Sequence, residues 1–308
     1  MKFLSAAQHI YAYEPEMKGV AEVSPGDSAV FETQDCFAGQ IQTEETLCAD
    51  IDFDHVNPAT GPLHVVGAEK NDLLGVLIES IETADRAASV VVPGAGVMPD
   101  RVEASLTRIL EIDGKNRRCS FRGLNLPLKP MIGVIGVATA SERVPTGTPG
   151  SHGGNMDTTD ITEKSVLWLP VFQKGALLAL GDCHAVMGDG EIGCSGAEVA
   201  AKVTVRLDLL KQAAFPWPIL VTPRELMIIA SAETLDLAAR TASEAMVQLV
   251  EKTLGLSMSD ALILCSLVMD LRISQVVDPQ KTVRAVMPLE ILPWEKVRAT
   301  LTAARGLW

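Results

Sequence analysis

The sequence predicts a mainly β fold, of sandwich or barrel type, followed by a C-terminal α+β region. Up to about residue 210, short apolar runs alternate with Gly, Pro, Asn and Asp, a spacing typical of strands and turns. In one of these runs, Val203, Val205 and Leu207 alternate with polar residues, as expected for a strand with one buried face. Beyond residue 223, the apolar residues change to helical spacing.

The first part of the chain, residues 1–215, is expected to be a β-rich domain. Its apolar runs span residues 28–31, 63–66, 75–81, 89–93, 131–139, 165–169, 177–180 and 200–209. Most of these runs are too short for helices, and turn-forming residues separate them. We therefore predict mainly antiparallel strands in this part, with a less regular segment at residues 83–112.

The second part, residues 216–308, is expected to form an α+β region that closes the β-rich domain or belongs to it. A helix is predicted over residues 234–253 from its apolar periodicity. A second helix is predicted at residues 261–269, with Ser257 or Ser259 as its N-cap. Strand-like character then returns at residues 271–277 and 282–288.

The composition excludes several classes of partner. The chain of 308 residues has a formal net charge of −13, so nucleic-acid phosphates and anionic membrane surfaces would be repelled. The aromatic content of 4% also argues against base stacking. No apolar run approaches the roughly 18 residues of a membrane-spanning helix, and the run after Met1 is too short for a signal peptide. We expect a cytoplasmic protein with reduced cysteines, and a homo-oligomer.

The densest chemistry lies in residues 181–191, where one histidine and several carboxylates stand between glycines. Glycine permits tight backbone turns, so that Asp182, His184, Asp189 and Glu191 can converge on one point. Imidazole and carboxylate ligands together suit a divalent cation such as zinc. The alternative is an acidic hairpin loop with an Asp-Gly turn, in which His184 is merely exposed.

Two further segments carry candidate ligands. His152 and Asp157 lie around paired glycines, and only five histidines occur in the chain. Two of these five lie in Gly-Asp-rich loops, where no apolar periodicity calls for a buried structural imidazole. Asp35 follows a short strand-like run and precedes a glycine. It is either a further ligand or the Asx turn at the end of a strand.

Several stretches between about residue 20 and residue 210 occur in the order typical of one enzyme family. They are Pro25-Gly26-Asp27 with Asp35-Cys36-Phe37, Asn57-Pro58-Ala59-Thr60-Gly61-Pro62 with Val65-Val66-Gly67-Ala68-Glu69, His152-Gly153-Gly154-Asn155-Met156-Asp157, and the segment 181–191. In these stretches the chain resembles the acetamidase/formamidase family of amide hydrolases. The resemblance implies hydrolysis of a small neutral amide, of the formamide or acetamide type, to a carboxylate and ammonia.

An amide carbonyl is a poor electrophile, and a divalent metal can both polarise it and activate water. The expected metal is zinc, with calcium as a structural alternative, and the candidate ligands are Asp35, His152, Asp157, Asp182 and His184. A catalytic ion keeps a position open to water, so not all five are expected to bind one ion. Asp35 is alternatively a partner that orients a ligand histidine.

The expected general base and later acid is Glu191, because burial near a metal can raise the pKa of a carboxylate into the useful range. Asp189 is the alternative for this role. Asn155 is expected to contact the carbonyl or the amide nitrogen of the substrate. These three residues complete the predicted catalytic set.

Other chemistries are open to similar residues. A cysteine amidase would use Cys36 or Cys183, but their acidic surroundings are expected to raise the thiol pKa and weaken the nucleophile. The nucleophile segment of a serine amidase is not found. Histidine and carboxylate ligands also describe a cupin-like metal-dependent oxygenase. A non-catalytic metal-binding β module with structural calcium is a further alternative, although calcium takes oxygen ligands and two loop histidines argue against it.

Overall fold

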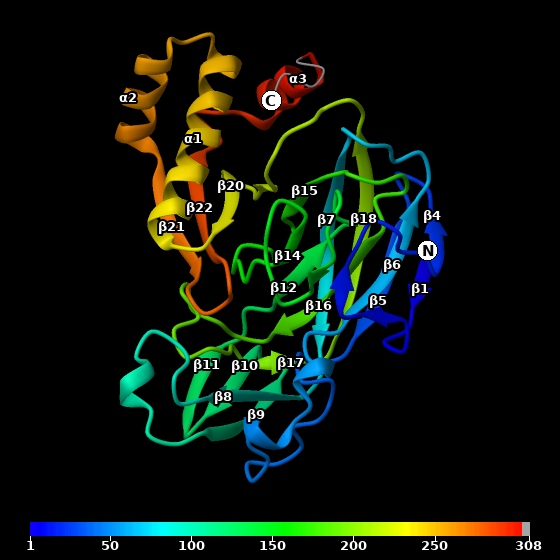
Figure 1. Cartoon of the computed structure of the whole chain (residues 1–308), viewed down its shortest axis with the longest axis vertical. Helices are drawn as coiled ribbons and strands as arrows, with labels where there is room; N and C mark the ends of the chain where they lie inside the picture. Colours follow the sequence, from blue (N-terminus) through cyan, green and yellow to red (C-terminus); the bar gives the residue numbers. More distant parts are fainter. Residues whose placement is uncertain (304–308) are drawn as a thin grey trace.

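The computed structural model describes residues 1–303, which form two large β-sheets, a two-stranded sheet and three α-helices (Figure 1). The first sheet has nine strands. In spatial order they are β1 (Lys2–Leu4), β5 (Ser28–Thr33), β18 (Ala201–Leu210), β7 (Leu73–Thr83), β15 (Val166–Pro170), β19 (Ile219–Val221), β20 (Glu225–Ala232), β22 (Lys281–Pro288) and β21 (Asp270–Gln275). Strands from both parts of the chain therefore share this sheet.

The second sheet has eleven strands and carries most of the chemistry described below. Its main path is β11 (Leu124–Pro127), β10 (Arg118–Phe121), β9 (Leu106–Asp113), β8 (Arg86–Val91), β17 (Glu198–Val199), β16 (Leu178–His184), β12 (Met131–Gly136) and β14 (Gly153–Asn155). Strand β6 (Ala59–Val65) pairs with β16, β2 (His9–Ile10) and β4 (Ala21–Val23). The two-stranded sheet joins β3 (Ala12–Tyr13) to β13 (Val144–Pro145), and short 3-10 helices span Cys48–Asp50, Phe53–His55 and Pro99–Arg101.

The predicted mainly β class is confirmed. The main core joins buried residues of the two large sheets, such as Phe31 and Val203 of the first and Ile135 and Leu180 of the second. In strand β18, Val203 and its apolar neighbours two residues apart are fully buried, as the alternation predicted. Within residues 1–303 the sheets do not close into a barrel. The segment 83–112 proved to contain the hairpin of β8 and β9.

The two helices predicted in the C-terminal part are present near their predicted ranges. Helix α1 (Leu235–Leu254) begins after Thr234, whose side chain accepts a hydrogen bond from the Leu237 backbone N–H, and it ends at Gly255 in the left-handed conformation. Helix α2 (Met258–Val268) uses Ser257, the first of the two candidate caps. Helix α1 packs on β20 and β22. None of the helices in residues 1–303 is long and apolar enough to cross a membrane.

The sequence analysis did not predict helix α3 (Trp294–Ala303). Its buried side chains are Val297 and Leu301 alone. Two apolar positions four residues apart are too few to stand out as a helical pattern. The helix lies beside α1 near the C-terminus of the chain (Figure 1).

Candidate active site

Five ionisable side chains converge in the interior of the protein. Asp157, Asp182, His184, Glu191 and Glu198 are each between 1% and 7% exposed, and we call them the carboxylate–histidine cluster. Charged side chains are seldom buried so deeply unless they are paired or bind a metal. The alternative of an acidic loop with an exposed His184 is therefore wrong.

The Nε2 atom of His184 is the centre of this cluster. It lies 3.0 Å from Glu198 Oε2 and 3.3 Å from Asp182 Oδ1. The distance to Asp157 Oδ1 is 3.7 Å. Ligand atoms of Asp157, His184 and Glu191 also lie within 4.8 Å of one another. One imidazole nitrogen thus faces carboxylates from several segments of the chain.

The second sheet brings these residues together from separate segments. Strand β16 carries both Asp182 and His184, and its antiparallel neighbour β17 places Glu198 opposite His184. Asp157 follows β14, which pairs with β12 on the other side of β16. Glu191 lies in the loop after β16. Long-range strand pairing therefore determines the geometry of the cluster.

Three cluster residues have left-handed backbone conformations. The φ angles are 40° at Asp157, 49° at Asp182 and 45° at Glu191. For residues other than glycine, sparsely populated conformations cost about 1 to 3 kcal/mol each, and they persist where the surrounding structure imposes them. Such residues gather at functional sites, and here they direct carboxylates toward one point.

Gly133 of strand β12 permits the close approach of two of these carboxylates. A Cβ atom at this position would lie 2.4 Å from Asp157 Oδ1 and 2.8 Å from both the backbone oxygen and Oδ2 of Asp182. No larger residue fits without displacing them. The glycine therefore allows the two aspartates to share the space above β12.

Burial and mutual repulsion alter the acidity of the cluster. Burial raises the pKa of Glu191 to about 8 and that of Glu198 to about 7, and it raises the pKa of Asp157 well above its ordinary value. Burial alone lowers the pKa of His184, but Glu198 and Asp182 outweigh it and raise this pKa well above its ordinary value. The cluster therefore holds protons near neutral pH or requires a cation.

Several polar atoms at the cluster have no hydrogen-bond partner. They include Asp157 Oδ1, Glu191 Oε2, Asn155 Oδ1 and Asp278 Oδ2. Buried acceptors without partners are uncommon and indicate a missing ion, water or ligand. An imidazole nitrogen and a carboxylate oxygen that bind one zinc ion at about 2.1 Å lie roughly 3.0 to 3.4 Å apart. The distances from His184 Nε2 to Glu198 and Asp182 fall in this range, and the distance to Asp157 is longer.

The structure places two predicted ligands outside the cluster. Asp35 Oδ1 accepts hydrogen bonds from the backbone N–H groups of Phe37 and Gly39, which is the Asx turn considered as its alternative. His152 stacks edge-on against Tyr13 with 5.1 Å between ring centroids, and burial lowers its pKa to about 4. Neither residue belongs to the two potential ligand groups found within residues 1–303, which are Cys36, Asp182 and Glu198, and Asp157, His184 and Glu191.

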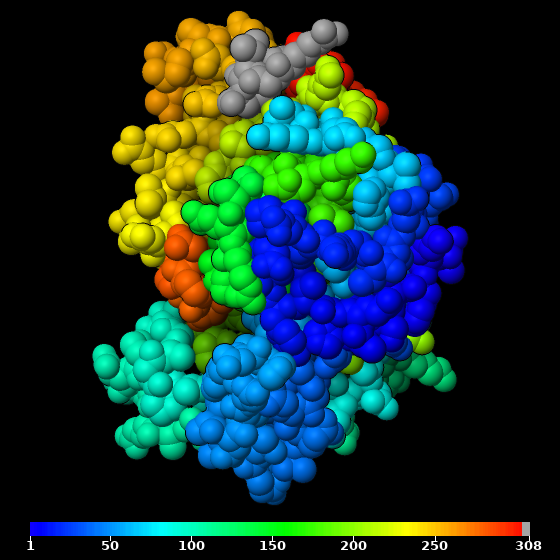
Figure 2. All heavy atoms as spheres, turned by 45° about the vertical axis from the view of Figure 1, so that its right-hand side comes forward, coloured from blue at the N-terminus to red at the C-terminus, as the bar shows by residue number. Residues whose placement is uncertain are grey.

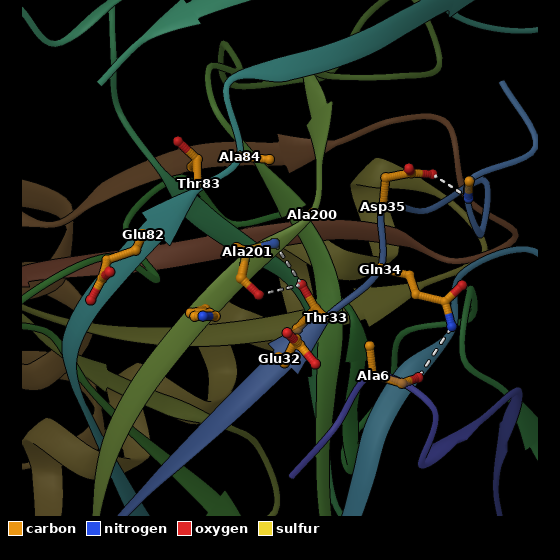
Figure 3. A pocket seen from close by; sticks show the side chains of 12 residues that line it. Ala6, Glu32, Thr33, Gln34, Asp35, Glu82, Thr83, Ala84, Ala200 and Ala201 are labelled. Atoms are coloured by element: carbon orange, nitrogen blue, oxygen red, sulfur yellow. Dashed lines mark hydrogen bonds between the residues drawn. The ribbon is translucent and has the colours of Figure 1, made fainter. Parts of the chain in front are cut away.

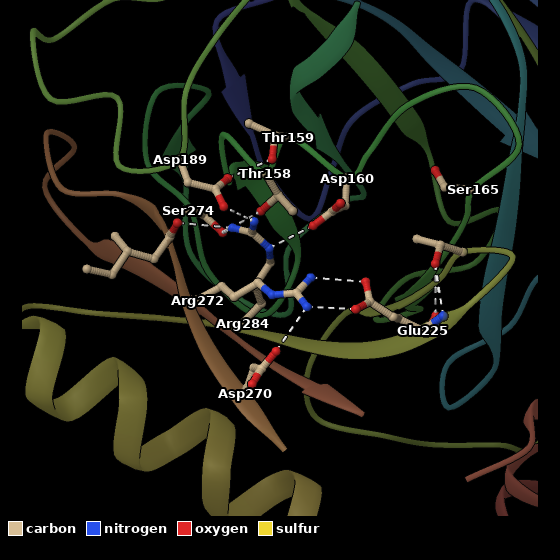
Figure 4. A network of polar contacts seen from close by, with 12 residues as sticks. Thr158, Thr159, Asp160, Ser165, Asp189, Glu225, Asp270, Arg272, Ser274 and Arg284 are labelled. Atoms are coloured by element: carbon tan, nitrogen blue, oxygen red, sulfur yellow. Dashed lines mark hydrogen bonds and ion pairs between the residues drawn. The ribbon is translucent and has the colours of Figure 1, made fainter. Parts of the chain in front are cut away.

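Asp189 does not converge on the cluster, although the sequence predicted that it would. Its carboxylate accepts hydrogen bonds from Thr159 Oγ1 at 2.6 Å and from Arg284 Nη2 at 2.6 Å, and its side chain is 43% exposed. Figure 4 shows Arg284 between Asp160 and Asp189. This buried arginine ties the loop before Glu191 to strands β21 and β22, because its Nη1 also donates to Ser274 Oγ.

Comparison with known proteins identifies the family of the chain. The model of the acetamidase/formamidase family matches residues 5–146 and 139–293 of the chain. The chain belongs to this family. A predicted acetamidase/formamidase from Thermoanaerobacter tengcongensis has 44% identity and a TM-score of 0.93, and an acetamidase from Bacillus halodurans has 42% identity and a TM-score of 0.91. Each alignment covers 96% of this chain and 99% of the other.

A formamidase from Methylophilus methylotrophus is more distant. It is 26% identical over 70% of this chain and 70% of its own length. The family model extends to residue 293 and so includes the β21–β22 hairpin, which lies beyond the family motifs found in the sequence. The loop of this hairpin contains Asp278, one of the residues at the site.

Two residues that sequence reasoning missed lie at the site of this family member. Glu198 pairs with His184 from strand β17, and Asp278 comes from the loop between β21 and β22. The Asn155 side chain hydrogen-bonds the Asp278 carboxylate. Glu198 stands in an apolar stretch, and an isolated acid there was the one available signal. Asp278 lies in an ordinary turn sequence and carried no signal.

An open pocket of about 550 Å³ lies beside the site rather than within it. Thr33, Gln34 and Asp35 follow one another along its wall, and Glu82 faces it from β7 (Figure 3). None of the cluster residues lines it. The Thr33 hydroxyl reaches Cys183 Sγ of strand β16 at 3.8 Å, so this pocket borders the strand that carries Asp182 and His184.

We expect the metal-free protein to lose thermal stability as the pH rises from about 6.5 to 8. A carboxyl group with a raised pKa favours the folded state at low pH, and this contribution disappears as the pH rises to its folded-state pKa, about 8 for Glu191 and about 7 for Glu198. The lowered pKa of His152 acts in the opposite sense, but only below its ordinary value of 6.5.

Melting temperatures measured in the presence of a chelator at pH 6.5 and pH 8 test this expectation. The Glu191→Gln variant is the control, because it has no carboxyl group to titrate and should show a smaller decrease. A melting temperature that rises over this interval in the unsubstituted protein would contradict the assignment of raised pKa values to the cluster.

Proposed function

We propose that this protein hydrolyses a small aliphatic amide, of the formamide or acetamide type, to a carboxylate and ammonia in a metal-dependent reaction. Membership of the acetamidase/formamidase family supports the amide bond as the target. The observation that carries the metal dependence is the buried His184 Nε2 surrounded by carboxylate oxygens, with further acceptors unpaired beside it.

The residues that would hold the ion are His184, Asp182 and Glu198, with Asp157 as a fourth. Glu198 Oε2 and Asp182 Oδ1 lie 3.0 and 3.3 Å from His184 Nε2, and Asp157 Oδ1 lies 3.7 Å from it. The two shorter distances match ligands that share one zinc ion. Zinc suits this set because one ligand is an imidazole, whereas calcium takes oxygen ligands. When bound, such an ion polarises a carbonyl oxygen and lowers the pKa of a water molecule.

Glu191 is the proposed proton carrier. Its Oε2 atom is buried and has no hydrogen-bond partner. In its carboxylate form, which a bound cation would favour, it would accept a proton from the attacking water. The same carboxyl group then donates a proton to the leaving nitrogen, which turns a poor leaving group into ammonia. Burial raises the pKa of Glu191 to about 8 without a cation, and a bound cation would lower it, so that both protonation states are accessible near neutral pH.

A cysteine mechanism has weaker support. Burial raises the pKa of the Cys183 thiol to about 12, so a negligible fraction is thiolate at neutral pH. Burial likewise raises the pKa of Cys36 well above its ordinary value, and Glu198 adds to this effect. Both thiols are therefore poor nucleophiles. The expected direction of these shifts is confirmed, with burial rather than charge as the main cause.

The decisive experiment is an ammonia-release screen over unbranched amides of about one to four carbons, with metal analysis of the same preparation. We expect formamide or acetamide to release ammonia, stoichiometric zinc to accompany the protein, and a chelator to abolish the activity. Zinc added back should restore it. A folded, metal-loaded protein that releases no ammonia from any of these amides would refute the proposed function.

The screen also separates metal dependence from amide hydrolysis. Ammonia release that persists at full rate without bound metal would support amide hydrolysis but refute its proposed metal dependence. Iron in place of zinc, with uptake of oxygen, would indicate the oxygenase alternative. A homo-oligomeric state and a cytoplasmic location stay predictions from the sequence.

A further inference from the structure

Asn155 and Asp278 form a polar pair on the flank of the carboxylate–histidine cluster. The Asn155 side chain hydrogen-bonds the Asp278 carboxylate, and Asn155 is 5% exposed. The negative charge of Asp278 acts on Glu191, and those of Asp157 and Asp182 act on Asp278. The pair therefore borders both the proposed proton carrier and the proposed metal ligands. Asp278 itself belongs to neither potential ligand group.

Backbone contacts hold the Asp278 loop against the Glu191 loop. Gly190 donates its N–H to Ser274 O at 2.8 Å, and its carbonyl accepts from the Val276 N–H at 3.2 Å. The Gln275 side chain accepts from the Asp278 N–H and donates to Thr282 Oγ1. Figure 2 shows the tip of this hairpin, in orange, beside green segments from the middle of the chain. The position of Asp278 is therefore built into the fold.

Each member of the pair retains one unused acceptor. Asn155 Oδ1 and Asp278 Oδ2 are both shielded from solvent and have no hydrogen-bond partner. An unpaired buried acceptor is unfavourable, so the two in this pair indicate a ligand that brings donors. A primary carboxamide brings two N–H donors on one nitrogen. An ester, by contrast, brings none.

We propose that Asn155 Oδ1 and Asp278 Oδ2 bind the –NH₂ group of a primary amide and then the ammonia released from it, and so select primary amides. This inference rests on the proposed amide hydrolysis. The two acceptors orient the nitrogen, and Glu191 supplies the proton that it needs to leave. The products balance as one carboxylate and one ammonium ion for each amide and water consumed.

The test compares acetamide with methyl acetate, whose leaving group has no N–H donor. Asp278→Ala should lower kcat/KM for acetamide by about 10- to 100-fold, and it should change kcat/KM for methyl acetate by less than about threefold. Asn155→Ala should show the same contrast. Because Asn155 is uncharged, its removal leaves the charge of the site unaltered. Inhibition by ammonium chloride should weaken about tenfold or more in both variants.

The matched control is Asp270→Asn, on the same hairpin with a side chain that is 67% exposed. It should leave kcat/KM for acetamide, kcat/KM for methyl acetate and inhibition by ammonium chloride near the wild-type values.

Equal losses of kcat/KM on the amide and the ester would show a structural role and overturn the proposal. Unchanged inhibition by ammonium would also overturn it. If methyl acetate reacts too slowly to measure, the ammonium constants decide alone. If the wild-type protein hydrolyses acetamide but either contradicting outcome is found, the proposed role of Asn155 and Asp278 is refuted and the proposed function is not.

Discussion

The His184→Ala variant is expected to lose both its bound metal and its activity. The imidazole Nε2 faces Glu198, Asp182 and Asp157 together, so its removal takes away the nitrogen ligand and leaves carboxylates that repel one another. Asp182→Ala should have the same effect. Metal content per protein chain and kcat/KM for acetamide are the measurements.

Glu191→Gln is the matched comparison for the ligand variants. It should retain the metal and lose about 10²- to 10⁴-fold in rate, because glutamine preserves the shape of the side chain but transfers no proton. Full metal content and near-normal turnover in His184→Ala would show that the cluster is not a metal site. Loss of metal from Glu191→Gln alone would make Glu191 a ligand and require another base.

Gly133→Ala is expected to abolish most of the activity through a single added methyl group. The new Cβ would lie 2.4 Å from Asp157 Oδ1 and 2.8 Å from two oxygens of Asp182, one of them in the backbone. Displacing two carboxylates by about an ångström should cost on the order of 10²-fold in kcat/KM. Overpacking should also destabilise the fold by about 1 to 3 kcal/mol. Kinetics, metal content and chemical denaturation measure these effects.

Gly188→Ala is the control for this substitution. Gly188 lies in the loop before Glu191, yet a Cβ atom there would have nothing within 4 Å. It should retain activity within about threefold and full stability. Near-normal activity in Gly133→Ala, with its metal in place, would mean that the positions of Asp157 and Asp182 are not critical to the reaction.

Part of the candidate site could be predicted because its residues are close in sequence. Asp182, His184 and Glu191 belong to one glycine-rich segment, and Asp157 lies beside a pair of glycines. Local composition was enough to select them. It could not separate them from Asp189, which lies between His184 and Glu191 in sequence but pairs with Arg284 of strand β22. That arginine is distant in sequence, and no residue near Asp189 predicts the ion pair between them.

The remaining site residues depend on strand register. Glu198 meets His184 only because β17 pairs with β16 in one register, and a shift by one residue would direct Glu198 to the other face of the sheet. Asp278 meets Asn155 only because the β21–β22 hairpin lies against Gly190. Such pairings depend on contacts across long sequence separations, which local patterns do not encode.

The sequence by itself determined the mainly β class, the helices α1 and α2, and the family, because alternation, helical periodicity and short motifs are local properties of the chain. Only the tertiary structure decided which acids surround His184: it places Glu198 beside His184 Nε2, Asp35 in an Asx turn and Asp189 against Arg284. The physical reason is that gathering buried acids is unfavourable in itself, so it occurs only where pairing between distant strands and the close approach at Gly133 impose it, and those contacts form only in the folded chain.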